Sequence, residues 1–138
     1  MCGILGGNNQ RWNYIKGIES MISRGPDGTK VTKLEDFCLA FTRLAVIDLS
    51  ENGMQPMFSK DNQVGIVYNG EIYGYQKLRR QLERKGHQFS STSDTEVILN
   101  AYLEYGERFV TKIDGMFAIS IYDKRDGKSG LIPNLSLY

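Results

Sequence analysis

The residue with the clearest potential for chemistry is Cys2, which directly follows the initiator methionine. Methionine is usually removed when a small residue follows it, and its removal leaves Cys2 with a free α-amine. An α-amine has an ordinary pKa of about 7.7–8.0 and a thiol one of about 8.5, so both exchange protons near neutral pH. The amine can accept the thiol proton and return it to a leaving group. The pattern predicts a nucleophile that carries its own base. On position alone, Cys2 could equally be a small residue without a catalytic role.

The other residues that could support such chemistry are few. The chain has one histidine and one further cysteine. His87 follows Gly86, where we expect a helix to end, so we predict a solvated loop residue rather than a catalytic base. No Cys/His pattern has the spacing of a zinc site. Cys38 lies in an apolar segment and is expected to be an inert core thiol. In a reducing compartment both thiols would stay free.

The composition places the chain among ordinary globular domains. Its 138 residues are 41% apolar and carry a net charge of +1, which predicts one domain over residues 1–138 with a substantial core. A balanced charge gives no basic footprint for nucleic acid or an acidic membrane surface. No apolar run approaches the roughly 18 residues of a membrane span, and the N-terminus has no signal-peptide pattern. The expected location is the cytoplasm.

The elements that must position Cys2 follow from periodicity and turn signals. Strands are predicted where β-forming or apolar residues are concentrated, at residues 2–7, 37–47, 64–68 and 116–122. One helix carries Trp12, Ile15, Ile18 and Ile22, and a second carries Tyr75, Leu78 and Leu82. A third begins at Ser93, which has capping-box spacing to Glu96. This order indicates an α+β fold with an antiparallel sheet.

The C-terminal stretch is different. Residues 124–130 form a polar segment typical of a turn, and residues 131–138 have no clear period. From this we expect a domain that is C-terminally truncated. A sheet without its last strands would leave open edges and exposed apolar surface, so a homodimer or another partner is expected.

Six motifs in order resemble one known family. The resemblance runs from Met1 to about Arg125, and the family is the glutaminase domain of glutamine-dependent asparagine synthetase, a class II (N-terminal nucleophile) amidotransferase. It implies a four-layer αββα sandwich of two antiparallel sheets. The motifs are Met-Cys-Gly-Ile (1–4), Arg-Gly-Pro-Asp (24–27), Arg-Leu-Ala-Val-Ile-Asp (43–48) with Gly-Met-Gln-Pro-Met (53–57), Tyr-Asn-Gly-Glu-Ile-Tyr (68–73), Ser-Asp-Thr-Glu-Val-Ile (93–98) and Asp-Gly-Met-Phe-Ala (114–118).

The resemblance implies an oxyanion hole beside the nucleophile. Amide hydrolysis passes through a tetrahedral oxyanion, and its donors would be the Asn69 side chain and the Gly70 backbone N–H. Read locally, Asn69-Gly70 between two strand-like runs is also a strong signal for a type I′ hairpin turn.

The resemblance also assigns the groups that recognise L-glutamine. Arg43 would bind the α-carboxylate as a bidentate fork, although an arginine of an edge strand could instead reach water. Asp94 would bind the α-ammonium, although an acid is favoured in the first turn of a helix in any case. Glu71 and the backbone at Val46 and Ile47 are further candidates for substrate contacts.

A loop is expected to support the nucleophile, and it comprises Arg24, Gly25, Pro26 and Asp27. Read without the family, it is a Gly-Pro turn. The sequence departs from the family at Ser23, Phe41 and Thr42, where histidine and a His-Glu or similar pair are common. None of these is expected to touch the reacting atoms.

The sequence thus predicts a glutaminase domain that forms a γ-glutamyl thioester on Cys2 and feeds ammonia to a synthetase partner. It requires no metal or organic cofactor, since ATP would serve only the absent synthetase domain. Two alternatives stay open: an inactive relative acting as a regulatory or interaction module, and another amide-hydrolysing or acyl-transfer enzyme of the N-terminal nucleophile class.

Overall fold

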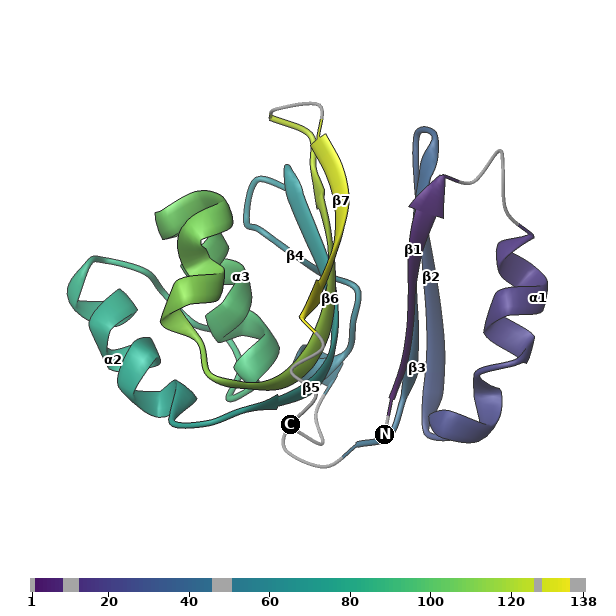
Figure 1. Ribbon diagram of the computed structural model, residues 1–138, viewed down its shortest axis with the longest axis horizontal. Helices are drawn as coiled ribbons and strands as arrows, with labels where there is room; N and C mark the ends of the chain where they lie inside the picture. The colour runs from purple at the N-terminus through teal and green to yellow at the C-terminus, as the bar shows by residue number, and fades with distance from the viewer. Residues whose placement is uncertain (1, 9–12, 46–50, 126–127, 135–138) are drawn as a thin grey trace.

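The computed structural model describes residues 2–8, 13–45, 51–125 and 128–134. Figure 1 shows four layers, in which two antiparallel sheets face each other and helices cover both outer faces. This arrangement confirms the predicted αββα sandwich. It also supplies two separate cores, one between the sheets and one beneath the larger helices.

The first sheet has the strand order β1-β3-β2. Its strands are β1 (Gly3–Asn8), β2 (Gly28–Leu34) and β3 (Phe37–Arg43). Every residue of β3 is buried, because β3 has a strand on each side and both faces of the sheet are covered there. The antiparallel register pairs Gly3 with Thr42, so Cys2 and Arg43 lie at the same end of the sheet.

Helix α1 (Tyr14–Glu19) covers the outer face of this sheet (Figure 1). Asn13 caps it by accepting a hydrogen bond from the Lys16 backbone N–H at 3.2 Å. The helix is shorter than the spacing of isoleucines predicted. Only Ile18 is buried, whereas Ile15 is exposed and Ile22 belongs to the separate 3₁₀ turn η1 (Ile22–Arg24). A helix of six residues is too short to carry Ile15, Ile18 and Ile22 together, and Trp12 lies outside the described residues.

The second sheet has the order β4-β5-β6-β7. Its strands are β4 (Met57–Phe58), β5 (Val64–Ile72), β6 (Gly115–Asp123) and β7 (Lys128–Asn134), and the short turn η2 (Glu51–Gly53) precedes β4. Residues 124–125 form a turn as expected, but residues 128–130 of the predicted turn and residues 131–134, where the sequence has no clear period, pair with β6 as strand β7. An edge strand has only one neighbour and needs no apolar run, which explains why the sequence pattern did not reveal it.

Helices α2 (Tyr75–Arg84) and α3 (Asp94–Tyr105), with the 3₁₀ turn η3 (Gly106–Lys112), cover the second sheet (Figure 1). Ser93 caps α3 as predicted, accepting from the Thr95 backbone N–H at 3.1 Å. The Glu96 carboxylate does not complete the capping box at Ser93. It accepts instead from the backbone and hydroxyl groups of Ser90 and Ser91, and so fixes the loop before the helix.

Alternation along β5 divides its side chains between the two cores. Ile66 and Tyr68 belong to the core under the helices, whereas Val67 belongs to the core between the sheets. Leu39 and Phe41 of β3 fill this inner core, and Cys2 packs against it from the end of the sheet. The start of β1, the end of β3 and the middle of β5 therefore meet at one end of the sandwich.

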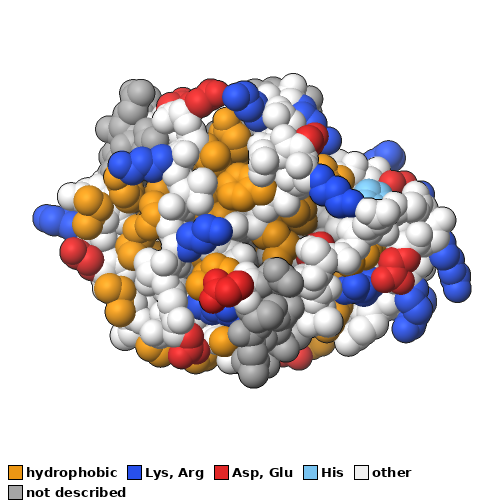
Figure 2. All heavy atoms as spheres, turned by 180° about the vertical axis from the view of Figure 1, so that it is seen from behind, with side chains coloured by type: hydrophobic (Ala, Val, Ile, Leu, Met, Phe, Trp, Pro, Cys, Tyr) orange, Lys and Arg blue, Asp and Glu red, His pale blue; other side chains and the backbone are white. Residues whose placement is uncertain are grey.

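The surface and the thiols add three observations. Figure 2 shows acidic and basic side chains interspersed over one face, with apolar side chains exposed near its centre. In the described ranges, no helix is long and apolar enough to cross a membrane. Both cysteines are free thiols; burial raises the pKa of Cys38, as expected for a core thiol.

Candidate active site

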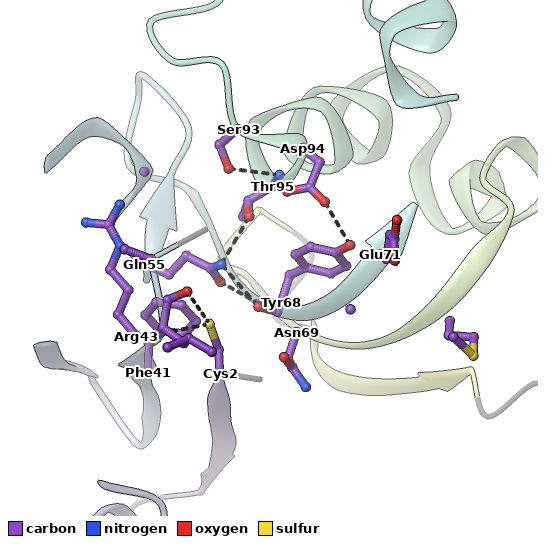
Figure 3. Close-up of a pocket in the computed structure, with 15 residues that line it drawn as sticks. Cys2, Phe41, Arg43, Gln55, Tyr68, Asn69, Glu71, Ser93, Asp94 and Thr95 are labelled. Carbon is purple, nitrogen blue, oxygen red and sulfur yellow. Dashed lines mark hydrogen bonds between the residues drawn. The ribbon is translucent and has the colours of Figure 1, made fainter. Parts of the chain in front are cut away.

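One cavity gathers six of the residues that the sequence singled out for the site. It has a volume of about 450 Å³ and opens where β1, β3, β5 and α3 meet (Figure 3). The sequence-predicted residues that line it are Cys2, Arg43, Asn69, Gly70, Glu71 and Asp94. Val46 and Ile47 lie outside the described residues. Residues 24–27 do not line the cavity.

Cys2 is half-buried at the base of this cavity, and its sulfur contacts the chain just after β3. The Leu44 backbone N–H donates to Cys2 Sγ at 3.2 Å, and Sγ lies 3.5 Å from the Leu44 carbonyl, which can accept the thiol proton. The thiol is thus held by a backbone segment of the neighbouring strand.

Asn69 and Gly70 lie inside β5, so the hairpin-turn interpretation is wrong. Asn69 pairs with Ala118 and Gly70 pairs with Phe117 across β6. Gly70 has φ +157°, and a Cβ there would stand 2.3 Å from the Met116 carbonyl oxygen. Only glycine fits this position. The Asn69 side chain leaves the strand on the side opposite the Tyr68 ring (Figure 3).

Arg43 ends the central strand of the first sheet and is only 6% exposed. The alternative of an edge-strand arginine reaching water is therefore wrong. In Figure 3 its guanidinium lies toward one side of the cavity, whereas Glu71 and Asp94 lie toward the other. A cavity with a cation at one side and carboxylates at the other is complementary to a zwitterion.

Asp94, the first residue of α3, is 5% exposed and accepts a hydrogen bond from the Tyr68 hydroxyl at 2.9 Å. Burial raises the pKa of Asp94, while the bond from Tyr68 acts in the opposite direction. The pKa of Tyr68 is raised far above its ordinary value by burial and by the adjacent Asp94 charge. Tyr68 therefore remains a proton donor to Asp94 at every physiological pH. Glu71 is exposed at the mouth.

The loop at 24–27 supports the backbone beside the nucleophile. The Asp27 backbone N–H donates to the Arg43 carbonyl at 2.9 Å, and the Asp27 carboxylate accepts from the Ala45 N–H at 2.9 Å. A Cβ at Gly25 would lie 2.2 Å from the Thr42 carbonyl carbon, so glycine lets the loop approach β3. Arg24 is exposed at the end of η1. The loop supports the site from behind rather than lining it.

Three polar residues that sequence reasoning did not select also belong to the site. Gln55 and Thr95 line the cavity and share a hydrogen bond, and Thr42 anchors the start of β1. The Thr42 hydroxyl accepts from the Gly3 N–H and donates to the Met21 carbonyl, both at 3.1 Å. A signal for Gln55 existed, since it is the polar residue of the Gly-Met-Gln-Pro-Met motif.

His87 has the predicted loop position but not the predicted solvated side chain. It lies in the loop after α2, as predicted, but its side chain is 18% exposed and bonded to Asn100 and Glu104, so it is not simply solvated. It lines a different cavity, beside α3 and β4. The sole histidine is thus not a base for Cys2.

Comparison with known proteins agrees with this geometry. A family model for the glutamine amidotransferase domain matches residues 1–132. "Asparagine synthetase [glutamine-hydrolyzing] 1" of Bacillus subtilis (strain 168) is 42% identical over 135 residues, covering 91% of this chain and 21% of that protein. "Asparagine synthetase [glutamine-hydrolyzing] 2" of Arabidopsis thaliana is 43% identical over 133 residues, covering 91% and 22%.

The chain thus spans about a fifth of the length of these relatives. A solved structure of glutamine phosphoribosylpyrophosphate amidotransferase from B. subtilis superimposes with a TM-score of 0.55 at 23% identity, covering 64% of this chain and 21% of that one. This likeness supports the fold, whereas the family rests on the sequence match over residues 1–132. The chain belongs to the glutamine amidotransferase domain family.

Proposed function

We propose that this chain hydrolyses L-glutamine to glutamate and ammonia through a γ-glutamyl thioester on Cys2. The observation that carries the proposal is one cavity that holds the thiol of Cys2, the Asn69-Gly70 pair, a buried arginine and a buried aspartate. A thiol alone would be compatible with many functions. Its placement among groups complementary to a free amino acid points to glutamine.

Recognition of the substrate follows from charge. The α-carboxylate pairs with the guanidinium of Arg43, which presents a planar fork of donors. The α-ammonium pairs with Asp94, assisted by Glu71 at the mouth, and the backbone at Val46 and Ile47 supplies further contacts. The side-chain amide of glutamine then extends toward Cys2. Burial disfavours the negative charge of Asp94, and the incoming ammonium would give that charge a positive partner.

The chemistry uses the N-terminal amine. After removal of Met1, the α-amine of Cys2 takes the thiol proton, and the sulfur attacks the amide carbon of glutamine. The Asn69 side chain and the Gly70 N–H stabilise the oxyanion. Removing one donor of this kind typically raises the barrier by about 3–4 kcal/mol. The amine returns the proton to the departing nitrogen, the C–N bond breaks and ammonia leaves. Water then cleaves the thioester, which releases glutamate and restores the thiol.

The proposed reaction requires no metal or organic cofactor, because the amine supplies proton transfer and the protein supplies the oxyanion donors. The relatives named above are glutamine-hydrolysing asparagine synthetases, and this chain matches about a fifth of their length. We therefore propose that the ammonia passes to a synthetase, either a partner or a further domain, and that ATP would serve this synthetase rather than glutamine hydrolysis. A reducing cytoplasm would keep the Cys2 thiol available.

The test is glutamate release from L-glutamine by the purified chain, after intact mass has established that Met1 is absent. Cys2→Ala should abolish turnover. D-Glutamine and L-asparagine should be poor substrates, because binding by Arg43 and Asp94 fixes the configuration at the α-carbon and the distance from it to the reacting amide. Folded protein without Met1 that shows no turnover would overturn the enzymatic proposal. It would instead favour an inactive relative that serves as an interaction module.

A further inference from the structure

The side chain of Gln55 takes the place of a missing strand residue beside β5. Backbone pairing between β4 and β5 is confined to Met57 with Ile66 and Phe58 with Gly65. At Tyr68, farther along β5, the Gln55 amide makes both bonds that a neighbouring peptide group would make. Its Oε1 accepts from the Tyr68 N–H at 2.5 Å, and its Nε2 donates to the Tyr68 carbonyl at 3.1 Å. Gln55 is 5% exposed, so these bonds are shielded from water.

The same amide reaches the head of α3. Gln55 Nε2 also donates to Thr95 Oγ1 at 3.0 Å. Thr95 follows Asp94, and Asp94 accepts from the Tyr68 hydroxyl. Hydrogen bonds thus join Gln55 to Tyr68 and Thr95, and Tyr68 to Asp94, as the dashed lines in Figure 3 show. The peptide bond between Asp94 and Thr95 closes these contacts into a ring. The ring joins the residue before Asn69 to the carboxylate at the opposite side of the cavity.

This ring holds the β5 side of the cavity in place relative to the head of α3. The main chain of Tyr68 is held by Gln55, and its hydroxyl holds the carboxylate of Asp94. Without this donor the buried carboxylate of Asp94 would keep only its backbone hydrogen bonds at the head of α3 and would be held less firmly. Holding it in one orientation lowers the entropy lost when a cationic group binds. The hydrogen bond also opposes the effect of burial, which raises the pKa of Asp94.

We propose that Tyr68, held by Gln55, is a positioning residue that sets the selection for the α-ammonium of the substrate by orienting Asp94. The inference rests on the proposed function, because it concerns the same cavity and the same ligand. It differs from a merely structural role in one respect. A structural tyrosine would affect all ligands alike, whereas a residue that orients Asp94 affects only ligands with an α-ammonium.

The test compares two ligands that differ only in that group. L-Glutamine and 4-carbamoylbutanoate share the carboxylate and the amide, but the second lacks the α-ammonium. Binding of each is measured by calorimetry in a Cys2→Ala background, so that turnover does not enter. The Tyr68→Phe variant, which removes one hydroxyl, is expected to weaken L-glutamine binding about tenfold, equivalent to about 1.4 kcal/mol. Binding of 4-carbamoylbutanoate is expected to stay within twofold.

Tyr102→Phe is the matched control. Tyr102 is a buried tyrosine that donates to the buried Asp123 at 3.0 Å, and neither residue lines the cavity. Its loss should leave the preference between the two ligands unchanged. Gln55→Met removes the bonds to the Tyr68 backbone and should reduce the preference as Tyr68→Phe does.

The outcomes separate this inference from the hydrolytic proposal. If Tyr68→Phe weakens both ligands equally, or neither, Tyr68 does not orient Asp94 for selection and the inference is wrong. It is equally wrong if the parent protein binds L-glutamine no better than 4-carbamoylbutanoate. Failure of the chain with Cys2 intact to release glutamate would overturn hydrolysis alone, because the binding comparison does not depend on turnover.

Discussion

The Leu44 backbone N–H lies 3.2 Å from the sulfur of Cys2. The next residue, Ala45, donates its own N–H to the Asp27 carboxylate at 2.9 Å. An acidic residue outside the cavity therefore holds the peptide segment that contacts the nucleophile. This relationship gives the Arg-Gly-Pro-Asp loop a physical role. It fixes the backbone behind Cys2 without touching the proposed substrate.

Replacing Asp27 should loosen this segment. Asp27→Ala removes the acceptor of the Ala45 N–H, and we expect kcat/KM for L-glutamine to fall about tenfold, as for the loss of one hydrogen bond to a charged group. Asp27→Asn is the matched control, because its amide oxygen can still accept that bond. Steady-state glutaminase kinetics check the result. Equal activities for the two variants would show that the bond to Ala45 does not matter.

Thr42 is expected to hold the first residues of β1. Thr42→Val keeps the shape but leaves the buried Gly3 N–H without its hydroxyl acceptor, which should lower the free energy of unfolding by about 1–3 kcal/mol. Because Gly3 follows Cys2, activity should fall as well. Thr42→Ser retains the hydroxyl and should stay near the parent in both respects. Denaturant unfolding and glutaminase assays on the three proteins check this; a serine variant as impaired as the valine variant would contradict it.

The layered fold could be predicted from the sequence because ordered motifs and apolar strands define it. The same motifs placed Cys2, Arg43 and Asp94 together, and the cavity brings them together. Local patterns failed where distant pairing decides the structure. Asn69-Gly70 has the composition of a turn, but pairing with β6 extends the strand through both residues. β2 and β7 were missed because strands at a sheet edge need few apolar residues.

The hydrogen-bonded ring could not be predicted for a related reason. Gln55 bonds to Thr95 across 40 positions of sequence and to Tyr68 across 13. No local spacing in the sequence encodes hydrogen bonds of a side chain with another side chain or with the backbone over such separations. His87 shows the same effect, because a loop position predicted exposure while Asn100 and Glu104 on α3 half-bury it.

Gly70 should tolerate no side chain. In Gly70→Ala the new Cβ would meet the Met116 carbonyl oxygen and Phe117 Cα at 2.3 and 2.6 Å, so β5 and β6 must separate. We expect a loss of about 2–4 kcal/mol in the free energy of unfolding, from backbone strain and overpacking together. Gly74→Ala is the control, because Gly74 has φ +62° but nothing within 4 Å of the added Cβ. It should lose only about 1–2 kcal/mol. Similar losses in thermal unfolding would show that the contact with β6 is unimportant.

The ionised carboxylate of Asp94 should lower the stability of the fold but strengthen the binding of L-glutamine. Because its pKa is raised in the folded protein by burial, the folded state binds the Asp94 proton more tightly than the unfolded state does. The stabilisation from protonation is therefore fully present below the unfolded pKa of about 3.9 and is lost as pH rises through the folded pKa. Asp94→Asn, which keeps an oxygen for the Tyr68 hydroxyl, should be more stable than the parent at pH 7 by about 1 kcal/mol. This gain should disappear near pH 3.

The same substitution should weaken L-glutamine binding roughly 10- to 100-fold, because the ammonium loses a charged partner. In the parent, affinity should fall as pH decreases through the raised pKa of Asp94, with Tyr68 and Glu71 as the ionisable neighbours that influence it. Thermal unfolding between pH 3 and pH 8 and calorimetric titration with L-glutamine measure both effects. An Asp94→Asn variant that is less stable at pH 7 and binds L-glutamine normally would show that the buried carboxylate serves the fold rather than the substrate.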